Sequence, residues 1–357
     1  MKKILILTTA LCGFATLASA DVTVMSWGGA YGGAQTEAHL KPFTAKTGIG
    51  AVMVDSDNPA TPIKAMVEAG NVTVDVASVE YADAIRMCDD GLLEPVDINA
   101  LPAGSDGTPA KDDFLAGAVT DCGVSTDIWA TVFAYDTTKI TGTVPTTVAD
   151  FFDTAKFPGK RGLHKGAKAV LEFALMGDGV APADVYKTLA TPEGVDRAFK
   201  KLDTIKKDVV WWEAGSQAPQ LLADGEVAMT TAYNGRIFNA AITEGKPFQI
   251  VWDGELYENE MYVIPKGAPH MDEAKQFVAF ATSTEGLRNQ AQQISYGPAR
   301  KSALKDELLF KDGKTVMGPN QPTNPENMKN ALGSDFQFWV DHDAELNDRF
   351  NAWLAAN

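Results

Sequence analysis

Short apolar runs alternate with helix-forming segments along the first part of the chain. The runs at residues 22–25, 51–54 and 72–77 have the length and composition of buried strands. A helix-forming segment follows each of them, at residues 34–46, 61–69 and 82–90. This order of elements predicts a parallel sheet with helices on both faces.

The same alternation continues to the end of the chain. Five further apolar runs predict strands at residues 128–135, 209–212, 227–231, 248–252 and 261–264, and residues 163–176 pair a short strand with a helix. Helical segments are predicted at residues 182–189, 192–205, 217–224, 237–244, 272–283, 286–293 and 335–355. We therefore expect an α/β protein, and we place the passage into a second lobe at the run that begins at Ile128.

The first 20 residues have the pattern of a secretory signal peptide. A pair of lysines precedes an apolar stretch at residues 4–17, and ASA at residues 18–20 matches a cleavage site. Cys12 lacks the small preceding residue that a lipoprotein signal needs, so we expect no lipid anchor. We expect cleavage after Ala20, export to the periplasm, and no membrane span in the remaining chain.

Removal of this leader changes the size and charge that matter for function. It leaves 337 of the 357 residues and takes the formal charge from −16 to −18, because two lysines leave with it. A chain of this length exceeds what one hydrophobic core usually supports, which predicts two lobes. The acidic balance argues against nucleic acid and anionic membrane surfaces as partners.

Two cysteines remain after the leader, Cys88 and Cys122. Neither has the spacing to another cysteine or to a histidine that a metal site needs, and exported proteins fold where disulfides form. We expect a disulfide between them rather than two buried free thiols. We also expect no metal site and no cofactor.

The segment DVTVMSWGGAYGG at residues 21–33 joins the first predicted strand to the first predicted helix. Such a junction exposes backbone N–H groups at the carboxyl end of a sheet, where open α/β sheets bind ligands. Trp27 and Tyr31 lie in this loop. Trp27 either lines a ligand pocket or caps the strand and packs on the helix, and apolar pockets are commonly lined by aromatic side chains.

Five loops at predicted strand ends combine aromatic with charged or polar residues. They lie at residues 27–31, 78–81, 164–166, 233–236 and 258–260. Because these loops occur in both predicted halves of the chain, they indicate a cleft that is lined from two sides.

The side chains in these loops have chemistry suited to an amine-bearing solute. Trp27 and Tyr233 can sandwich an alkyl-ammonium group through cation–π contacts, and Glu80 or Glu260 can pair with it. Arg236 has the planar fork that binds a carboxylate. Two other roles stay open: Arg236 in a surface or interlobe ion pair, for example with Glu260, and Glu80 as a charge at a helix N-terminus.

Signatures of catalysis are weak in this sequence. The four histidines do not form HExxH, and no GxSxG accompanies a serine nucleophile. A dinucleotide site in the glycine loop would need glycine at the position of Ala30, and Trp27 and Tyr31 would crowd the pyrophosphate. We expect a binding protein and not an enzyme, with an exported enzyme acting on a small amine or amino acid as the alternative.

Five segments in order along the chain carry a family resemblance. They are SWGGAY at residues 26–31, VDVASVEYADAI at 74–85, ADGEVAMTTAYNGR at 223–236, LYENEMYVIPKGAPH at 256–270 and ISYGPARKSA at 294–303. Over nearly its whole length the mature chain resembles the periplasmic solute-binding proteins of ABC importers, specifically the spermidine/putrescine-binding group.

This resemblance implies a two-lobed periplasmic-binding-protein fold of type II. Each lobe would contain a mainly parallel sheet flanked by helices, and two hinge strands, at residues 128–135 and 258–263, would join the lobes. We expect lobe 1 to comprise residues 21–130 and 260–302, and lobe 2 residues 131–259 and 303–357. The implied function is a monomer that captures a small amine-containing solute by lobe closure and delivers it to an ABC permease in the inner membrane. A binding protein coupled to a chemoreceptor, with no role in transport, is a further alternative.

The resemblance also assigns ligand contacts to individual positions. The aromatic residues of the family map to Trp27, with Tyr31 beside it, and to Tyr233, while the acid that holds an ammonium maps to Glu260. Our candidate ligand-binding set is completed by residues of the same loops, Glu80, Tyr81 and Arg236.

Three departures from the family pattern bear on the ligand. Glu258 replaces a tryptophan, and an acidic pair is lost near Lys165, where Gly166 and Ala169 stand. Arg236 replaces a small neutral residue. A polyamine needs several acids along its length, so one retained acid together with Arg236 fits a zwitterion better, such as an ω-amino acid or an opine.

Overall fold

The computed structural model describes residues 21–356, so the predicted signal peptide lies outside the described residues. The strands are β1 (Val22–Ser26), β2 (Ala51–Asp55), β3 (Val76–Glu80), β4 (Gly123–Asp136), β5 (Arg161–His164), β6 (Val209–Trp212), β7 (Met229–Tyr233), β8 (Phe248–Val263) and β9 (Leu332–Gly333). The helices are α1 (Gly29–Gln35), α2 (Lys41–Thr47), α3 (Ala60–Glu68), α4 (Tyr81–Asp89), α5 (Ala110–Asp113), α6 (Val148–Phe152), α7 (Val170–Gly177), α8 (Val185–Leu189), α9 (Pro192–Asp203), α10 (Gln217–Ala223), α11 (Asn234–Phe238), α12 (Met271–Ala281), α13 (Thr284–Ala291) and α14 (Phe336–Ala355).

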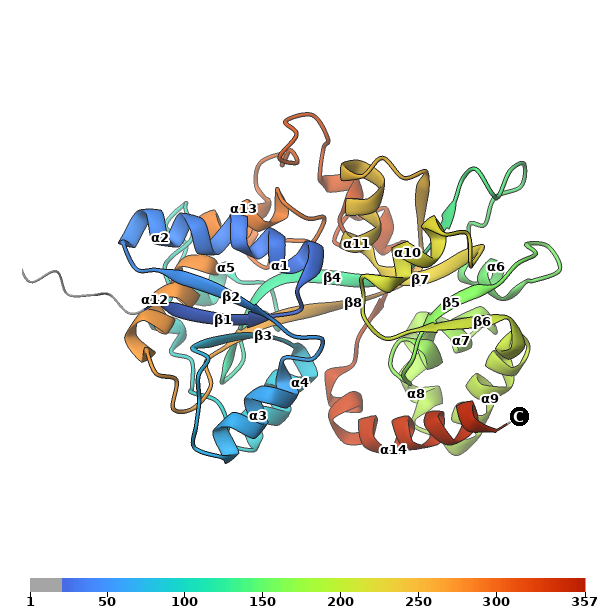
Figure 1. Ribbon diagram of the computed structural model, residues 1–357, viewed down its shortest axis with the longest axis horizontal. Helices are drawn as coiled ribbons and strands as arrows, with labels where there is room; N and C mark the ends of the chain where they lie inside the picture. Colours follow the sequence, from blue (N-terminus) through green and yellow to red (C-terminus); the bar gives the residue numbers. More distant parts are fainter. Residues whose placement is uncertain (1–20, 357) are drawn as a thin grey trace, which may run out of the picture.

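These elements form two lobes that lie side by side, with β4 and β8 running between them (Figure 1). We call the lobe that contains β1, β2 and β3 the first lobe, and the lobe that contains β5, β6 and β7 the second lobe. Strand pairing within each lobe is mainly parallel: β1 pairs with β2 and β3, and β5 pairs with β6 and β7. The predicted α/β fold with two hinge strands is confirmed.

One continuous sheet connects the two lobes, in the order β2-β1-β3-β8-β4-β7-β5-β6. At its centre lies the antiparallel pair of β4, with 14 residues, and β8, with 16 residues, which we call the hinge pair. The sequence pattern predicts two separate strands at 248–252 and 261–264, and this is wrong, because β8 runs through both. The polar residues Asp253, Gly254 and Glu255 interrupt the apolar pattern, and they lie in a bulge of the hinge pair between Val251 and Leu256.

The apolar runs of β1 and β3 are continuous because both faces of these two strands are buried. On β1, Val22 and Val24 pack into one cluster with Phe43 and Phe277, whereas Met25 packs into the cluster on the opposite face. Successive side chains of a strand point to opposite faces, so each face receives its own apolar set. In the second lobe, helices α7, α9 and α14 cover one face with a larger cluster.

The helix boundaries follow recognisable capping signals. Thr191, Ser283 and Asp335 precede α9, α13 and α14, and the side chain of each accepts a hydrogen bond from a backbone N–H in the first turn. The first helix is the exception. Its prediction began at residue 34, but α1 begins at Gly29, because Gly28 and Gly29 complete the turn with positive φ angles of 63° and 56°.

The region between α13 and α14 contacts both lobes. Leu308, Phe310 and Met317 form one apolar cluster with Phe238 of α11 and Ala291 of α13. From there the chain leads to α14, which lies along the second lobe in Figure 1. The expectation that residues 303–357 all belong to lobe 2 therefore describes α14 better than the region before it.

Cys88 and Cys122 form a disulfide bond, with their Cα atoms 5.7 Å apart. The predicted pairing is confirmed. It joins the end of α4 to the residue that precedes β4, so it fixes the entry of the chain into the hinge pair within the first lobe.

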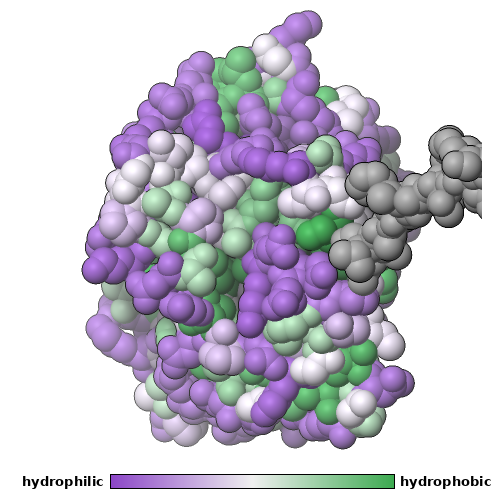
Figure 2. Space-filling model, turned by 90° about the vertical axis from the view of Figure 1, so that its left-hand side faces the viewer, coloured by the Kyte–Doolittle hydropathy of each residue, from purple (hydrophilic) through white to green (hydrophobic). Residues whose placement is uncertain are grey.

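Polar side chains dominate the end of the molecule formed by the first lobe, with apolar patches dispersed among them (Figure 2). Val52 and Val54 of the edge strand β2 are among the exposed apolar side chains. No helix within residues 21–356 combines the length and the apolar character that crossing a bilayer requires.

The bulge of the hinge pair buries a carboxyl group. Glu255 is fully buried, and neither of its carboxyl oxygens has a hydrogen-bond partner among the described residues. Burial raises the pKa of Glu255 to about 8, because the charged form loses its hydration without a compensating contact. The carboxyl group is therefore protonated at neutral pH.

We predict that Glu255→Gln stabilises the protein at alkaline pH. The pKa of Glu255 is higher in the folded protein than in the unfolded one. The free energy of unfolding therefore falls as the pH rises from the pKa of the unfolded protein toward about 8. The variant lacks this fall, so it should match the wild type at pH 5 and exceed it by roughly 2–5 kcal/mol at pH 9. Urea unfolding at both pH values measures the difference. Glu226→Gln, at an exposed position, is the control, and an equal effect of both substitutions would contradict the prediction.

Candidate functional site

A cavity of about 590 Å³ lies between the two lobes. Residues that follow β1, β2 and β3 line it on one side, and residues that follow β5, β6 and β7 line it on the other. All six strands therefore direct their carboxyl ends toward the cavity, as in other open α/β sheets that bind ligands. Each of the five loops singled out in the sequence contributes at least one residue to the lining.

The glycine turn after β1 brings two charged side chains against the backbone. A β-carbon on Gly28 would lie 2.8 Å from the carboxyl group of Asp55, and one on Gly29 would collide with Nη1 of Arg236. Arg236 belongs to α11 of the second lobe, and its Nη1 donates to the carbonyl oxygen of Gly28 at 3.1 Å. The absence of a side chain at Gly29 thus permits a contact between the lobes, whereas at Gly28 it leaves room for Asp55 of the first lobe.

Aromatic side chains form much of the cavity lining. Trp27, Tyr31 and Tyr233, all expected from the sequence, line it together with Trp129 of β4 and Tyr296. The ring of Tyr233 lies 5.1 Å from that of Trp129 in an edge-to-face arrangement, and Tyr31 lies 5.5 Å from Tyr296. Trp27 lines the cavity and also packs against a cluster that includes Tyr31 and Ala34 of α1.

Glu260 is a buried acid of the cavity, with 3% of its surface exposed. Its Oε1 accepts hydrogen bonds from Trp27 Nε1 at 2.7 Å and from Ser78 Oγ at 2.8 Å. Both donors are neutral. Burial raises the pKa of Glu260 well above its usual value, and the neighbouring Asp127 adds to the rise. A cation beside this carboxyl group would reverse the shift.

Arg236 is a buried cation of the same cavity, with 8% of its surface exposed. Its Nη1 and Nη2 contact the carbonyl oxygens of Gly28 and Trp27, at 3.1 and 3.4 Å, and its Nε is buried without an acceptor in the described part of the chain. No ion pair among residues 21–356 joins Arg236 to Glu260 or to any other carboxylate. The ion-pair role considered for Arg236 in the sequence analysis is therefore not the one that the structure shows.

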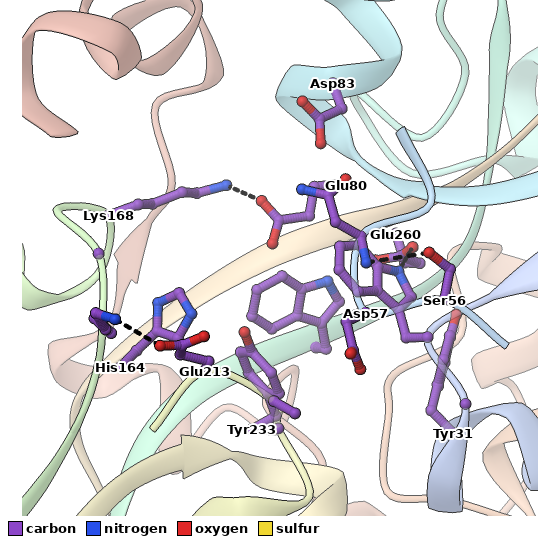
Figure 3. A pocket seen from close by; sticks show the side chains of 18 of the residues that line it. Tyr31, Ser56, Asp57, Glu80, Asp83, His164, Lys168, Glu213, Tyr233 and Glu260 are labelled. Atoms are coloured by element: carbon purple, nitrogen blue, oxygen red, sulfur yellow. Dashed lines mark hydrogen bonds and ion pairs between the residues drawn. The ribbon is translucent and has the colours of Figure 1, made fainter. Parts of the chain in front are cut away.

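A third charged group, which we call the acid–lysine cluster, consists of Glu80, Lys168 and Glu258. Lys168 Nζ lies 2.6 Å from Oε2 of Glu80 and 2.7 Å from Oε2 of Glu258. Burial alone would lower the pKa of Lys168, but Glu258 and Glu80 raise it well above its usual value. Burial alone would raise the pKa of Glu80, but Lys168 lowers it, so this pair is ionised. Figure 3 shows Lys168 extending across the cavity to Glu80.

The loop that carries Lys168 has a constrained backbone. Among the described residues, Ala169 is the non-glycine residue with a positive φ angle, 67°, and it directly precedes α7. A left-handed conformation costs a residue with a β-carbon about 1–2 kcal/mol. The surrounding structure therefore fixes this loop, and with it the position from which Lys168 reaches the cavity.

Six of the seven predicted ligand-binding residues line the cavity: Trp27, Tyr31, Glu80, Tyr233, Arg236 and Glu260. Tyr81 does not line it; its ring contacts that of Phe336 at 4.8 Å, where α4 meets α14. The sequence analysis missed Lys168, Trp129 and Tyr296. The apolar run at residues 128–135 held Trp129, but only the pairing of β4 with β8 reveals which face of the strand it occupies.

Acidic side chains outnumber basic ones in the cavity lining. The carboxylates are Asp55, Asp57, Glu80, Asp83, Glu213, Glu260 and Asp343, and the cations are Arg86, Lys165, Lys168 and Arg236. Figure 3 shows some of these groups facing the same space from different elements, among them Asp57, Glu80 and Glu260. This balance favours a ligand that carries a positive charge. Residues 21–356 contain no group of three or more potential ligands that could hold a metal ion.

Comparison with known families identifies the family and the fold. The family model described as bacterial extracellular solute-binding protein matches residues 38–318. The chain belongs to this family. As a solute-binding protein it is the substrate-binding component of an ABC transporter, and it acts outside the cytoplasm.

Several relatives of this solute-binding protein are known by their ligands. The gamma-aminobutyric acid-binding protein of Pseudomonas aeruginosa is 46% identical over 337 residues, 94% of this chain and 92% of the relative. The solved binding protein AgtB of A. tumefaciens R10, in complex with agropinic acid, is 33% identical with a TM-score of 0.81, and the match covers 94% and 99% of the two chains. A solved GABA receptor is 33% identical with a TM-score of 0.79, covering 94% and 98%.

The expected resemblance to the polyamine-binding group is also confirmed at the level of fold. The spermidine/putrescine-binding protein PotD of Streptococcus pneumoniae is 18% identical with a TM-score of 0.70, and the match covers 94% and 100% of the two chains. At this identity the likeness concerns the fold and carries no information on the ligand. The more similar relatives are named as binding proteins or receptors for solutes, which agrees with the expectation of a binding protein and lends the enzyme alternative no support.

We predict that Gly29→Ala weakens the contact between the lobes. The added methyl group imposes a left-handed φ on alanine and displaces Arg236 Nη1 from Gly28. The expected loss in the free energy of unfolding is about 1–2 kcal/mol. Gly33→Ala is the matched control, because its β-carbon meets open space in the same helix and should stabilise by about 0.5–1 kcal/mol. Denaturant unfolding compares the two, and equal stability of both variants would refute the role of Gly29.

Proposed function

We propose that this protein binds a small ω-amino acid, such as 4-aminobutyrate, and delivers it to the permease of its transporter. One observation carries the proposal. The cavity contains a buried carboxyl group, Glu260, and a buried guanidinium, Arg236, and neither has a partner of opposite charge among the described residues. A buried charge without a partner is costly, so the two groups together favour a ligand that supplies one charge of each sign.

The surrounding residues fit the two ends of such a ligand. An ammonium group beside Glu260 would contact the aromatic side chains of Trp27 and Tyr233, which stabilise cations through their ring faces. A carboxylate beside Arg236 would compensate the guanidinium, whose Nη atoms are held by carbonyl oxygens and whose Nε lies near Gly215. Tyr31 lines the same cavity, while its hydroxyl donates to Asp127 at 2.9 Å.

The relatives support the same ligand class. Two of them are named for gamma-aminobutyric acid, which carries an amine and a carboxylate at opposite ends of a short chain. A polyamine would instead bring cations alone to a cavity that already contains Arg236, and like charges in a buried site repel each other. A zwitterion therefore fits better than putrescine or spermidine.

We also infer how the protein operates in the cell. Residues 1–20 would be removed after Ala20, and the mature chain would act in the periplasm as a monomer. Ligand binding would stabilise the arrangement in which Arg236 of the second lobe contacts the turn of the first lobe, because a ligand shifts the equilibrium toward the state that it contacts best. The permease would then recognise the two lobes in contact.

We predict that Arg236→Met selectively weakens the binding of 4-aminobutyrate. Loss of the guanidinium should reduce affinity for this ligand by roughly 2–5 kcal/mol and change affinity for putrescine far less. Calorimetric titration with both ligands measures the ratio of the affinity for 4-aminobutyrate to the affinity for putrescine. Arg197→Met, at an exposed position of α9, is the control. Equal weakening of both ligands would mean that Arg236 only joins the lobes, and tight putrescine binding by the wild type would refute the zwitterion.

A second prediction concerns pH. Burial raises the pKa of Glu260 well above its usual value in the empty site, and an ammonium group beside it would lower that pKa, so binding shifts this carboxyl group toward its ionised form. Binding of 4-aminobutyrate should therefore release a proton, and its affinity should fall as the pH falls. Calorimetry at pH 6, 7 and 8 in buffers of different ionisation enthalpy counts the protons. Glu260→Gln should remove the release, and a release that persists in this variant would assign the proton to another group.

A further inference from the structure

Strand register places the carboxyl groups of Glu80, Glu258 and Glu260 on one face of the central sheet, next to that of Asp127, which is buried and does not line the cavity. Glu80 of β3 lies directly opposite Glu260 of β8 in the antiparallel pairing, so the two side chains share a face. Glu258 lies two residues before Glu260 on β8 and points to the same face, roughly 7 Å away along the strand. Without a further charge, this face would present an acid at each of two separated positions, which is the pattern that a diamine requires.

Lys168 changes this pattern, because its ammonium group is already bound there. Its Nζ lies 2.6 Å from Glu80 and within 2.9 Å of both carboxyl oxygens of Glu258. The side chain reaches the sheet from the constrained loop between β5 and α7 in the second lobe. Lys168 and Glu80 line the cavity, whereas Glu258 does not and is almost fully buried at 5% exposure.

Among Glu80, Glu258 and Glu260, it is Glu260 that has no cationic partner in the described chain. Its hydrogen bonds come from Trp27 and Ser78, which are neutral, whereas Glu80 and Glu258 share the charge of Lys168. Of these three acids, Glu80 and Glu258 are already paired with a cation, whereas Glu260 can still pair with a cationic ligand, although all three share one face of the sheet.

We propose that Lys168 determines specificity by serving as a built-in ammonium group. It occupies the second acidic position of the cavity, so that the site accepts a ligand with one ammonium and rejects a diamine. This inference rests on the proposed function, since it explains how the same acidic sheet face is adapted to an ω-amino acid. A diamine could place its two ammonium groups beside Glu260 and Glu80 only by displacing Lys168 from Glu80.

The alternative role for Lys168 is purely structural, because its contacts join the second lobe to β3 and to the hinge pair. Removal of a structural contact would weaken every ligand by the same factor. Removal of a built-in ammonium would instead uncover two carboxylates and favour diamines. The ratio of affinities for two ligands therefore separates the two roles, whereas either affinity alone does not.

The experiment compares Lys168→Met with wild type by calorimetric titration of 4-aminobutyrate and putrescine. Methionine retains most of the length of the side chain without its charge. We expect the ratio of the two affinities to shift at least tenfold toward putrescine. Lys187→Met is the control, because Lys187 of α8 in the same lobe also pairs with a carboxylate, the exposed Asp184, but does not line the cavity; its ratio should change less than threefold.

Lys168→Met leaves Glu80 and Glu258 without a cation, and the variant can fail to fold for that reason. A second variant is therefore needed. Lys168→Met combined with Glu258→Gln removes one charge of each sign and leaves Glu80 to receive the second ammonium, so it should also shift the ratio toward putrescine. An unchanged ratio in the folded variants would overturn the inference. The wild-type titration tests the proposed function separately, because a wild type that prefers putrescine refutes the ω-amino acid and not the effect of Lys168.

Discussion

The antiparallel pairing of β4 with β8 is the interaction on which the rest of the structure depends. It joins two mainly parallel half-sheets into one sheet, and it lies at the only place in the described chain where the sheet passes between the lobes. The same pairing sets the register that brings Trp129 opposite Glu258 and Asp127 opposite Glu260. A shift of one residue would turn these side chains to the opposite face and remove Glu260 from the cavity.

The cavity is organised by the cost of burying charge. The acid–lysine cluster meets this constraint internally, because the ammonium group of Lys168 contacts both Glu80 and Glu258. Glu260 and Arg236 do not, since they contact neutral donors and carbonyl oxygens respectively. The charges of the acid–lysine cluster are compensated within the protein and maintain its structure. The charges of Glu260 and Arg236 are not, and these two groups are suited to a ligand.

Much of the fold was predictable because it depends on local pattern. The apolar runs of the first lobe, the glycine turn after β1 and the pairing of two leftover cysteines all follow from short segments of sequence. The continuous strand β8 was not predictable, because Asp253, Gly254 and Glu255 break its apolar pattern and the long partner strand β4 overrides this local signal.

The candidate site was predictable in its residue types and not in its charge pairing. Aromatic and acidic residues at strand ends indicated Trp27, Tyr233 and Glu260 without any knowledge of the fold. The contacts of Lys168 could not be foreseen, because they depend on residues 88 and 90 positions away and on a backbone conformation that alanine rarely adopts. Tyr81 was misplaced for the related reason that α14, from the end of the chain, packs against it.

Trp27 contributes to the site through two chemically independent groups. Its indole donates to Glu260 and lines the cavity, whereas its backbone carbonyl oxygen accepts from Arg236 of the opposite lobe. Every amino acid carries that carbonyl group, so the acceptor persists whatever side chain occupies the position. Related chains can therefore change the side chain at this position, and with it the preferred solute, and still keep the hydrogen bond from arginine to the backbone carbonyl that joins the lobes.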